Sequence, residues 1–265
     1  MNVAILGGSA SGLMAAWAVI NAGHCPRIFD KHPRPPNPQT GFFYLHEPCD
    51  LPLRSKTAQV LVTGASPMDD LVALYRKKVY GDVIGPPVSI SDYLSKDEIN
   101  VFDGGQALNL LWDIVGPFVH DGGAFSWDEL CGMECWADAQ RIISTIPLNQ
   151  FILSLQSQTV WIKASEAPVD ESYVLYNVNP YVGWYRASAL FGHFNLEYAH
   201  CPNPNWVPGF DKHYLVNKVI SLTGERREQL KRNTPENVLL TGRYGKWDKS
   251  TMLHDVYRDV LEWLS

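Results

Sequence analysis

The first thirty residues alternate short apolar runs with one longer amphipathic segment. Residues 3–6 (VAIL) form an apolar run that ends at two glycines, which predicts a buried parallel strand. Residues 11–22 space their large apolar side chains at helical intervals, and Gly23 follows as a helix C-cap. Residues 27–30 (RIFD) predict a second strand. The chain is therefore expected to begin with a strand–helix–strand unit.

Further along, the pattern becomes irregular and then β-rich. Residues 31–53 contain many prolines, which forbid regular structure over most of this stretch, around an aromatic segment at 41–46 (GFFYLH). Paired strands are predicted across 181–198. Further strands are predicted at 59–63, 141–145, 159–162, 173–176 and 237–241, helices at 69–80, 107–115, 226–232 and 250–264, and a helix leading into a strand at 91–102.

Composition narrows the class of protein. The chain has 265 residues, 46% of them hydrophobic, and a net charge of −6, which argues against a surface built throughout to bind nucleic acid. Basic stretches at 76–78 and 226–232 are either local basic sites or solvated helix faces. Five irregularly spaced cysteines indicate neither a disulfide framework nor a metal site. Without a signal peptide or a long apolar run, we expect a cytoplasmic protein that does not contact membranes.

The turn after the first strand carries the clearest chemistry. It comprises Gly7, Gly8, Ser9, Ala10, Ser11 and Gly12. Glycine occupies the first and sixth places of a dinucleotide-binding turn, and serine at the third is small enough for close backbone approach. The following helix presents free N–H groups and its positive dipole end to a pyrophosphate. Asp30, which ends the second strand, suits the ribose hydroxyls of an adenosine, and the adjacent Lys31 joins the predicted cofactor site. A strand–helix–strand unit without a cofactor is the alternative.

Two later segments resemble one family. Residues 237–264 place a strand before Gly242 and Arg243, then a short loop and a helix. This resembles the closing segment of the superfamily of UDP-galactopyranose mutase and the flavin amine oxidases, including protoporphyrinogen oxidase. Residues 137–148 resemble the family's strand that ends in a T-x-P element. With residues 2–31, the three segments occur in the family's order. The chain is much shorter than typical members, and its substrate domain does not align.

The resemblance implies an α/β fold of the glutathione-reductase type. An FAD-binding Rossmann domain with a central parallel sheet would comprise 1–64, 135–150 and 233–265. A smaller, inserted β-rich substrate domain would comprise 65–134 and 151–232.

The resemblance also implies FAD as the cofactor. Gly242 and Arg243 would lie near its phosphates or ribityl chain, although Arg243 could instead only cap the strand end. Residues 249–252 would begin the helix whose dipole stabilises negative charge on the reduced flavin, with Thr251 and Met252 as its backbone N–H donors.

Candidate catalytic residues lie in the middle and near the end of the chain. We predict this role for Tyr44, His46, Tyr185, Arg186 and Trp247. A packed aromatic loop is the alternative for the first two. In 191–198, strand alternation places His193, Asn195 and Glu197 on one face. That face either lines a substrate site or is the solvated side of an edge strand.

Three functions follow as expectations. The first is an FAD-dependent oxidoreductase of the amine-oxidase type, acting on a C–N bond of a small amine or a nucleobase-linked amine. Its compact size also resembles flavoenzymes of bacterial viruses that remove an amino-acid group from hypermodified thymine, which makes DNA a candidate substrate. The second is a mutase-like enzyme using reduced flavin on a nucleotide sugar, with Tyr185 and Arg186 gripping the diphosphate. The third is a non-catalytic FAD-binding protein. The oligomeric state is left open.

Overall fold

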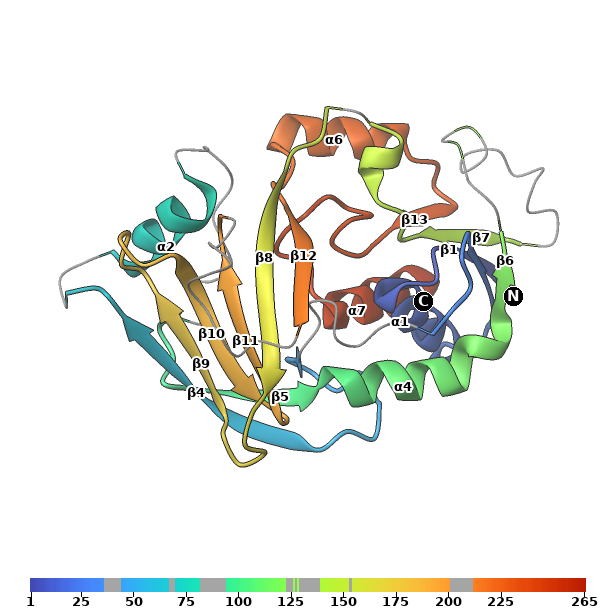
Figure 1. The fold of residues 1–265 in the computed structure, drawn as a ribbon. Coiled ribbons are helices and arrows are strands. Elements are labelled where there is room, and N and C mark those ends of the chain that lie inside the picture. The colour runs from blue at the N-terminus through green and yellow to red at the C-terminus, as the bar shows by residue number, and fades with distance from the viewer. Residues whose placement is uncertain are drawn as a thin grey trace.

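A computed structural model describes residues 1–35, 44–66, 70–81, 94–122, 126, 128, 139–152, 154–200 and 212–265. These residues form two sheets that lie beside each other, with helices packed between and around them (Figure 1). Predictions that fall on 41–43, 91–93 and 137–138, and on Cys131, Cys135 and Cys201, lie outside the described residues. The described Cys25 and Cys49 are free thiols.

The smaller sheet is parallel throughout and confirms the predicted α/β fold. Its strand order is β13-β7-β1-β2-β6, and each neighbouring pair runs parallel. The strands are β1 (Asn2–Leu6), β2 (Cys25–Asp30), β6 (Val119–Asp121), β7 (Arg141–Ser144) and β13 (Val238–Leu240). The opening strand–helix–strand unit therefore forms as the sequence predicts, with β1 at the centre.

Apolar cores on both faces explain why β1 lacks polar alternation. The helices α1 (Ala10–Asn21), α4 (Gly104–Val115) and α7 (Leu253–Leu264) pack against one face (Figure 1). Val3 and Ile5 join the core under these helices, whereas Ala4 and Leu6 join a second core on the opposite face. A strand buried on both faces reads as a continuous apolar run, as in other parallel sheets.

The larger sheet is mixed, with strand order β12-β8-β11-β10-β9-β4-β5-β3. All its neighbouring pairs are antiparallel except β4 and β9. Its strands are β3 (Tyr44–Leu45), β4 (Ser55–Thr63), β5 (Glu98–Asp103), β8 (Ser157–Glu166), β9 (Tyr173–Asn177), β10 (Trp184–Leu190), β11 (His193–Tyr198) and β12 (Lys212–Val219). The predicted pairing across 181–198 is the β10–β11 hairpin, whose turn residues Phe191 and Gly192 both have positive φ.

Sheet membership departs from the expected domain division in two places. β3 and β4 lie in the larger sheet, although residues 1–64 were assigned to the FAD-binding domain. α4 and β6 pack with the parallel sheet, although 65–134 were assigned to the substrate domain. Strand pairing decides both cases, because β4 bonds to β5 and β9 whereas β6 bonds to β2. The strand β12 has no counterpart among the sequence predictions.

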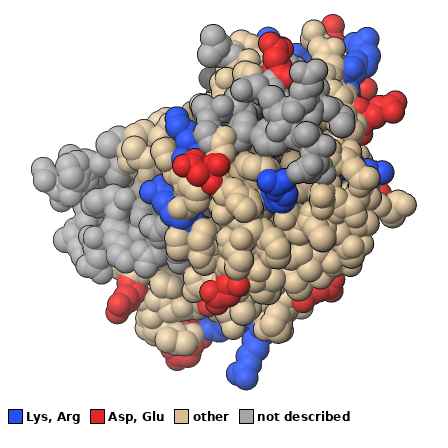
Figure 2. Space-filling view, turned by 90° about the vertical axis from the view of Figure 1, so that its right-hand side faces the viewer, with Lys and Arg blue, Asp and Glu red and all other residues tan. Residues whose placement is uncertain are grey.

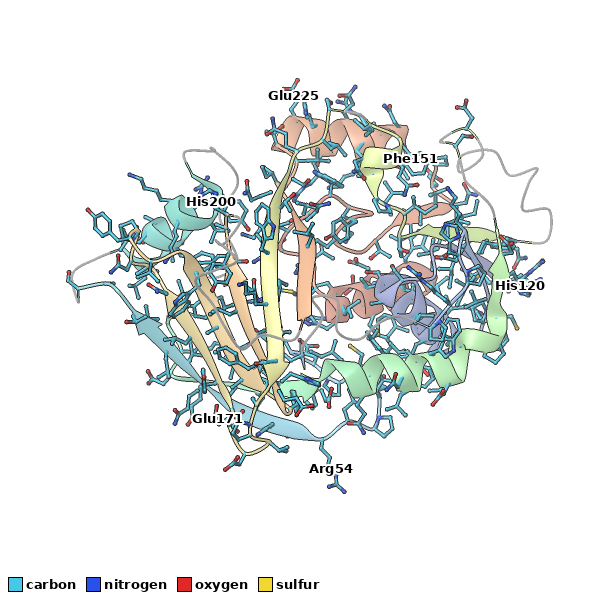
Figure 3. The ribbon with its side chains drawn as sticks, viewed as in Figure 1. Arg54, His120, Phe151, Glu171, His200 and Glu225 are labelled. Carbon is cyan, nitrogen blue, oxygen red and sulfur yellow. The ribbon has the colours of Figure 1, made fainter. Side chains whose placement is uncertain are left out.

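Two further helices complete the described structure. The helix α2 (Leu71–Tyr80) begins at Asp70, whose carboxylate accepts the backbone N–H groups of residues 72 and 73. The helix α6 (Gly224–Asn233) is polar, and Glu225 points outward from it (Figure 3). Short 3₁₀ turns occupy Gly116–Phe118 and Leu148–Gln150.

Charge is mixed on the surface. On the face shown in Figure 2, acidic and basic side chains of the described residues are interspersed. The basic stretch on α6 is partly paired, since Arg227 contacts Asp248 at 2.8 Å and Lys231 contacts Glu228 at 3.1 Å. Within the described part of the chain, no helix has the length and hydropathy needed to cross a membrane.

Candidate active site

The glycine-rich turn is built by close backbone packing. A β-carbon on Gly12 would lie 1.7 Å from the carbonyl oxygen of Gly7, so only glycine allows α1 to start this near β1. Gly7 itself has φ +99°, and its N–H donates to the Phe29 carbonyl at 2.8 Å. Both predicted glycine roles, the tight turn and the close helix approach, are thereby explained.

The beginning of α1 leaves backbone donors available. Ser9 is the N-cap, but its exposed side chain makes no capping hydrogen bond. The first bond of the helix joins the Leu13 N–H to the Ser9 carbonyl at 2.9 Å. In the described structure, the N–H groups of Ala10, Ser11 and Gly12 therefore have no acceptor. Unpaired N–H groups together with the helix dipole suit an anion at this point.

Asp30 ties the end of β2 to this turn. Its Oδ2 accepts the Gly8 N–H at 2.5 Å, and its Oδ1 accepts the His32 N–H at 2.7 Å. A carboxylate has about four lone-pair sites, so these two bonds leave Asp30 able to accept from ribose hydroxyls as well. Lys31 follows on the exposed surface.

The C-terminal segment meets the N-terminal turn. Gly242 has φ +80°, and a β-carbon on it would lie 2.8 Å from the Ser11 Oγ. The adjacent Arg243 donates from Nε to the Thr251 carbonyl at 3.3 Å and from Nη2 to the Met252 Sδ at 3.2 Å. Arg243 therefore holds the loop that leads into α7, and burial lowers the pKa of its guanidinium. Two predicted cofactor segments from opposite ends of the chain are thus in contact.

The predicted backbone donors at the start of α7 need a correction. The Thr251 N–H donates to the Asp248 carbonyl at 3.2 Å, and the Met252 N–H donates to the Asp255 carboxylate at 2.7 Å. The first bond closes a turn before α7 and the second belongs to its capping box, so neither N–H is available. The unpaired donors lie one step further on, because the N–H groups of Leu253 and His254 have no acceptor in the described residues.

A buried carboxylate organises the larger sheet. The Glu197 side chain accepts from the Tyr185 hydroxyl at 2.5 Å, from the Arg186 Nε at 2.5 Å and from the Lys218 Nζ at 3.1 Å. Burial alone would raise the pKa of Glu197, but the Arg186 and Lys218 cations outweigh burial and lower this pKa to about 2. Glu197 is 1% exposed and lies on β11 inside the sheet, so the edge-strand alternative is wrong for this residue.

A β-bulge lets two consecutive residues reach the same carboxylate. Trp184 pairs with Tyr198 and Arg186 pairs with Glu197, so Tyr185 is an extra residue in β10. Neighbouring residues in a regular strand point to opposite faces, whereas a bulge re-aims one of them. Tyr185 and Arg186 are therefore together, as predicted, but both are bonded to Glu197.

Tyr44 on β3 and His46 in the loop that follows were also predicted to be catalytic, and both lie at the junction with α7. The rings of Tyr44 and His46 are 5.0 Å apart, and those of His46 and His254 are 6.1 Å apart. Burial, together with His254 and the Arg186 and Arg243 cations, lowers the pKa of His46 to about 4. His46 is therefore neutral near pH 7, where an imidazole both donates and accepts a hydrogen bond.

Lys249 and Tyr80 contribute polar atoms that the sequence analysis missed. The Lys249 Nζ lies 3.7 Å from the centre of the Tyr80 ring. Neither this Nζ nor the Tyr80 hydroxyl has a hydrogen-bond partner, and both atoms are buried. Burial, reinforced by the Lys218, Arg243 and Arg186 cations, lowers the pKa of Lys249 to about 6. The buried Nδ1 of His254 also lacks a partner.

Trp247 lies apart from this cluster. It is 2% exposed and packs with Leu148, Val219 and Leu222 in a separate apolar core. Its indole N–H donates to the Gln156 carbonyl at 3.1 Å. Among the five predicted catalytic residues, the structure brings Tyr44, His46, Tyr185 and Arg186 into one electrostatically linked region and places Trp247 in the core.

Comparison with known proteins bears on the fold. No family model and no curated protein sequence matches the chain. Among solved structures, reduced UDP-galactopyranose mutase matches with a TM-score of 0.59 at 12% identity, covering 99% of this chain and 94% of that one.

Two further solved structures match equally broadly. Putrescine oxidase bound to putrescine matches with a TM-score of 0.53 at 10% identity, covering 99% of both chains. A protoporphyrinogen oxidase homologue from Exiguobacterium sp. 255-15 matches with a TM-score of 0.53 at 10% identity, covering 99% of this chain and 97% of that one. The chain therefore shares its fold with UDP-galactopyranose mutase, putrescine oxidase and the protoporphyrinogen oxidase homologue.

Proposed function

We propose that this protein binds FAD and acts as an oxidoreductase of the amine-oxidase type on a C–N bond of a small amine. The contact between Gly242 and Ser11 carries the proposal. It joins the turn that suits a pyrophosphate to the segment that leads into α7. One extended dinucleotide could then contact both helix N-termini. The whole-chain likeness in fold to putrescine oxidase supports the same assignment.

The described residues fit the two ends of such a cofactor. The unpaired N–H groups of residues 10–12 would hold the pyrophosphate, and Asp30 would accept from the adenosine ribose. The unpaired N–H groups of Leu253 and His254 would face the ring end, where the α7 dipole favours negative charge. Bound FAD would supply the hydride acceptor, while the protein supplies orientation and electrostatics.

The environment also suits an amine. Only a neutral amine can release a hydride from its α-carbon readily, so the protein must disfavour the ammonium form. The region that lowers the pKa of Lys249 to about 6 would lower the pKa of a substrate amine placed beside it for the same reasons, burial and neighbouring cations. His46 is neutral near pH 7, so it adds no positive charge beside the amine.

A spectroscopic experiment tests the proposal. The purified protein should show the absorption of oxidised flavin, and anaerobic addition of an amine substrate should bleach it. Putrescine, amino acids and an aminomethylated nucleoside would be compared, the last testing the nucleobase-linked form of the proposal. A protein that cannot be reconstituted with FAD would contradict the proposal at the cofactor. Bound flavin that no amine bleaches would contradict the assigned reaction alone.

A further inference from the structure

The candidate active site holds more positive than negative charge. Arg186, Lys218, Arg243 and Lys249 all lie within electrostatic reach of one another. Without a ligand Lys249 is mostly neutral at pH 7, because its pKa is about 6, and an anion beside it would favour its charged form. Among the described residues, Glu197 is the one carboxylate in close contact with the other three, and it pairs with Arg186 and Lys218 but not with Arg243. Lys249 and Arg243 therefore have no anionic partner there. Such an arrangement repels a cationic diamine and attracts an anion.

Two buried polar atoms without hydrogen-bond partners indicate where that anion would bind. The Lys249 Nζ and the Tyr80 hydroxyl come from different parts of the chain, the loop after β13 and the end of α2. Each is a buried hydrogen-bonding group without a partner. Such groups are costly to bury, so a folded protein retains them where a ligand completes their bonds. Both can donate to an oxygen, and no acceptor stands opposite them among the described side chains.

Lys249 is also held in place. Its backbone N–H donates to the Ser221 Oγ at 2.8 Å, and its Nζ stays over the Tyr80 ring. The neighbouring Asp248 accepts from Ser250 and Ser221 and pairs with Arg227, which fixes the loop on its other side. The amine is thus positioned before any ligand arrives, and a preorganised donor loses less conformational entropy on binding.

We propose that Lys249 and Tyr80 form an oxyanion subsite, which binds a carboxylate or phosphate group of the substrate while Arg243 adds positive charge. The assignment of this anion to the substrate rests on the proposed function. It deepens that function, because the amine that is oxidised would then also carry an anionic group. An amino acid has this chemistry and putrescine does not. Because α1 offers the cofactor's pyrophosphate its own N–H donors, the proposal assigns Lys249 and Tyr80 to the substrate's anion instead.

Calorimetric titration with inorganic phosphate and with acetate tests the subsite. The FAD-loaded protein would be compared with Lys249→Met, which keeps the aliphatic length, and with Tyr80→Phe, which keeps the ring. Lys231→Met is the matched control, because Lys231 is exposed and pairs with Glu228 on α6. We expect at least tenfold weaker binding of the better anion for Lys249→Met, several-fold weaker binding for Tyr80→Phe, and no change for Lys231→Met. A preference for phosphate or for acetate identifies the substrate's anionic group.

The outcomes separate the subsite from the cofactor. Equal affinity in the wild type and Lys249→Met, with circular dichroism showing both folded, would overturn the proposal. Loss of FAD from Lys249→Met would also overturn it, because Lys249 would then hold the cofactor's phosphate. If the wild type binds no FAD, the same titrations on the flavin-free protein still test the subsite, since only the difference between variants is used.

Discussion

Gly242 and Ser11 lie in direct contact although 231 positions separate them in the chain: a β-carbon on Gly242 would come within 2.9 Å of the Ser11 Cβ. Ser11 belongs to the first turn of α1, and Gly242 follows β13. The contact fixes the distance between the beginning of α1 and the loop held by Arg243. Any change that forces these segments apart should therefore affect cofactor binding before it affects the larger sheet.

Replacing Gly242 by alanine should weaken FAD binding. The new methyl group would meet Ser11, and the residue would also keep a positive φ that disfavours L side chains. We expect at least a tenfold loss of FAD affinity and a fall in stability of about 1–3 kcal/mol. Fluorescence titration with FAD and urea denaturation measure the two effects.

The matched control is Gly81→Ala. Gly81 has a similar φ of +66°, but nothing lies within 4 Å of the added β-carbon. This variant carries the backbone strain without the clash. If it loses as much FAD affinity as Gly242→Ala, the contact with Ser11 is not what positions the cofactor.

Replacing Glu197 by glutamine should destabilise the protein strongly. The change leaves the partly buried Arg186 and Lys218 beside a neutral amide. Removing one partner of a buried ion pair typically costs about 3–5 kcal/mol. Glu228→Gln is the control, since its exposed pair with Lys231 should contribute less than about 1 kcal/mol. Similar losses from both variants in chemical denaturation would contradict the assigned importance of the buried network.

The low pKa of Glu197 also predicts that the stability of the protein falls in acid. The pKa of Glu197 falls from 4.5 to about 2 on folding, so the folded state holds fewer protons than the unfolded state between these values. Its stabilising contribution is complete above pH 4.5 and is lost as the pH falls toward 2. The stability difference between the wild type and Glu197→Gln should therefore shrink over this window. A difference that stays constant across it would show that Glu197 keeps an ordinary pKa.

Trp247 should behave as a core residue. Trp247→Phe removes its hydrogen bond to Gln156 and part of its packing against Leu148 and Val219. We expect a stability loss of about 1–3 kcal/mol. The rate of anaerobic flavin reduction should stay within twofold of the wild type. A large fall in that rate, without a change in FAD content, would restore the catalytic role that the sequence predicted.

The sequence alone predicts structure and contacts where the local residue pattern and the burial of the residues agree. The run at residues 3–6, the glycine turn and the acid at position 30 are consecutive features of one unit, so their order predicts their contacts. The T-x-P strand and the strand before Gly242 belong to the segments that resemble the family, and in the parallel sheet β7 lies next to β1 and β13 next to β7. These parts rely on short-range geometry that the sequence encodes directly.

The site residues and contacts that the sequence did not predict depend on packing between distant parts of the chain. The shared bonding of Tyr185 and Arg186 to Glu197 was not predicted, because regular alternation would put these two residues on opposite faces and only the bulge brings both to one carboxylate. Lys218 lies on β12, a strand of alternating exposure without a recognised signal. Lys249 occurs in a polar loop sequence, where a lysine is normally solvated. Its burial depends on Tyr80, which is 169 positions earlier in the chain.

Replacing Lys249 should stabilise the protein by an amount that depends on pH. The pKa of this lysine falls from 10.5 to about 6 on folding, so between these values the unfolded state binds a proton that the folded state does not. Wild-type stability should therefore rise with pH across this range. Lys249→Met lacks this dependence and should be more stable than the wild type at pH 7, with the difference shrinking toward pH 10.5. Urea denaturation of both proteins at pH 7 and pH 10 measures the change, with Lys231→Met as the exposed control. A Lys249→Met variant that is less stable than the wild type at pH 7 would mean that the amine is charged and paired in the folded protein.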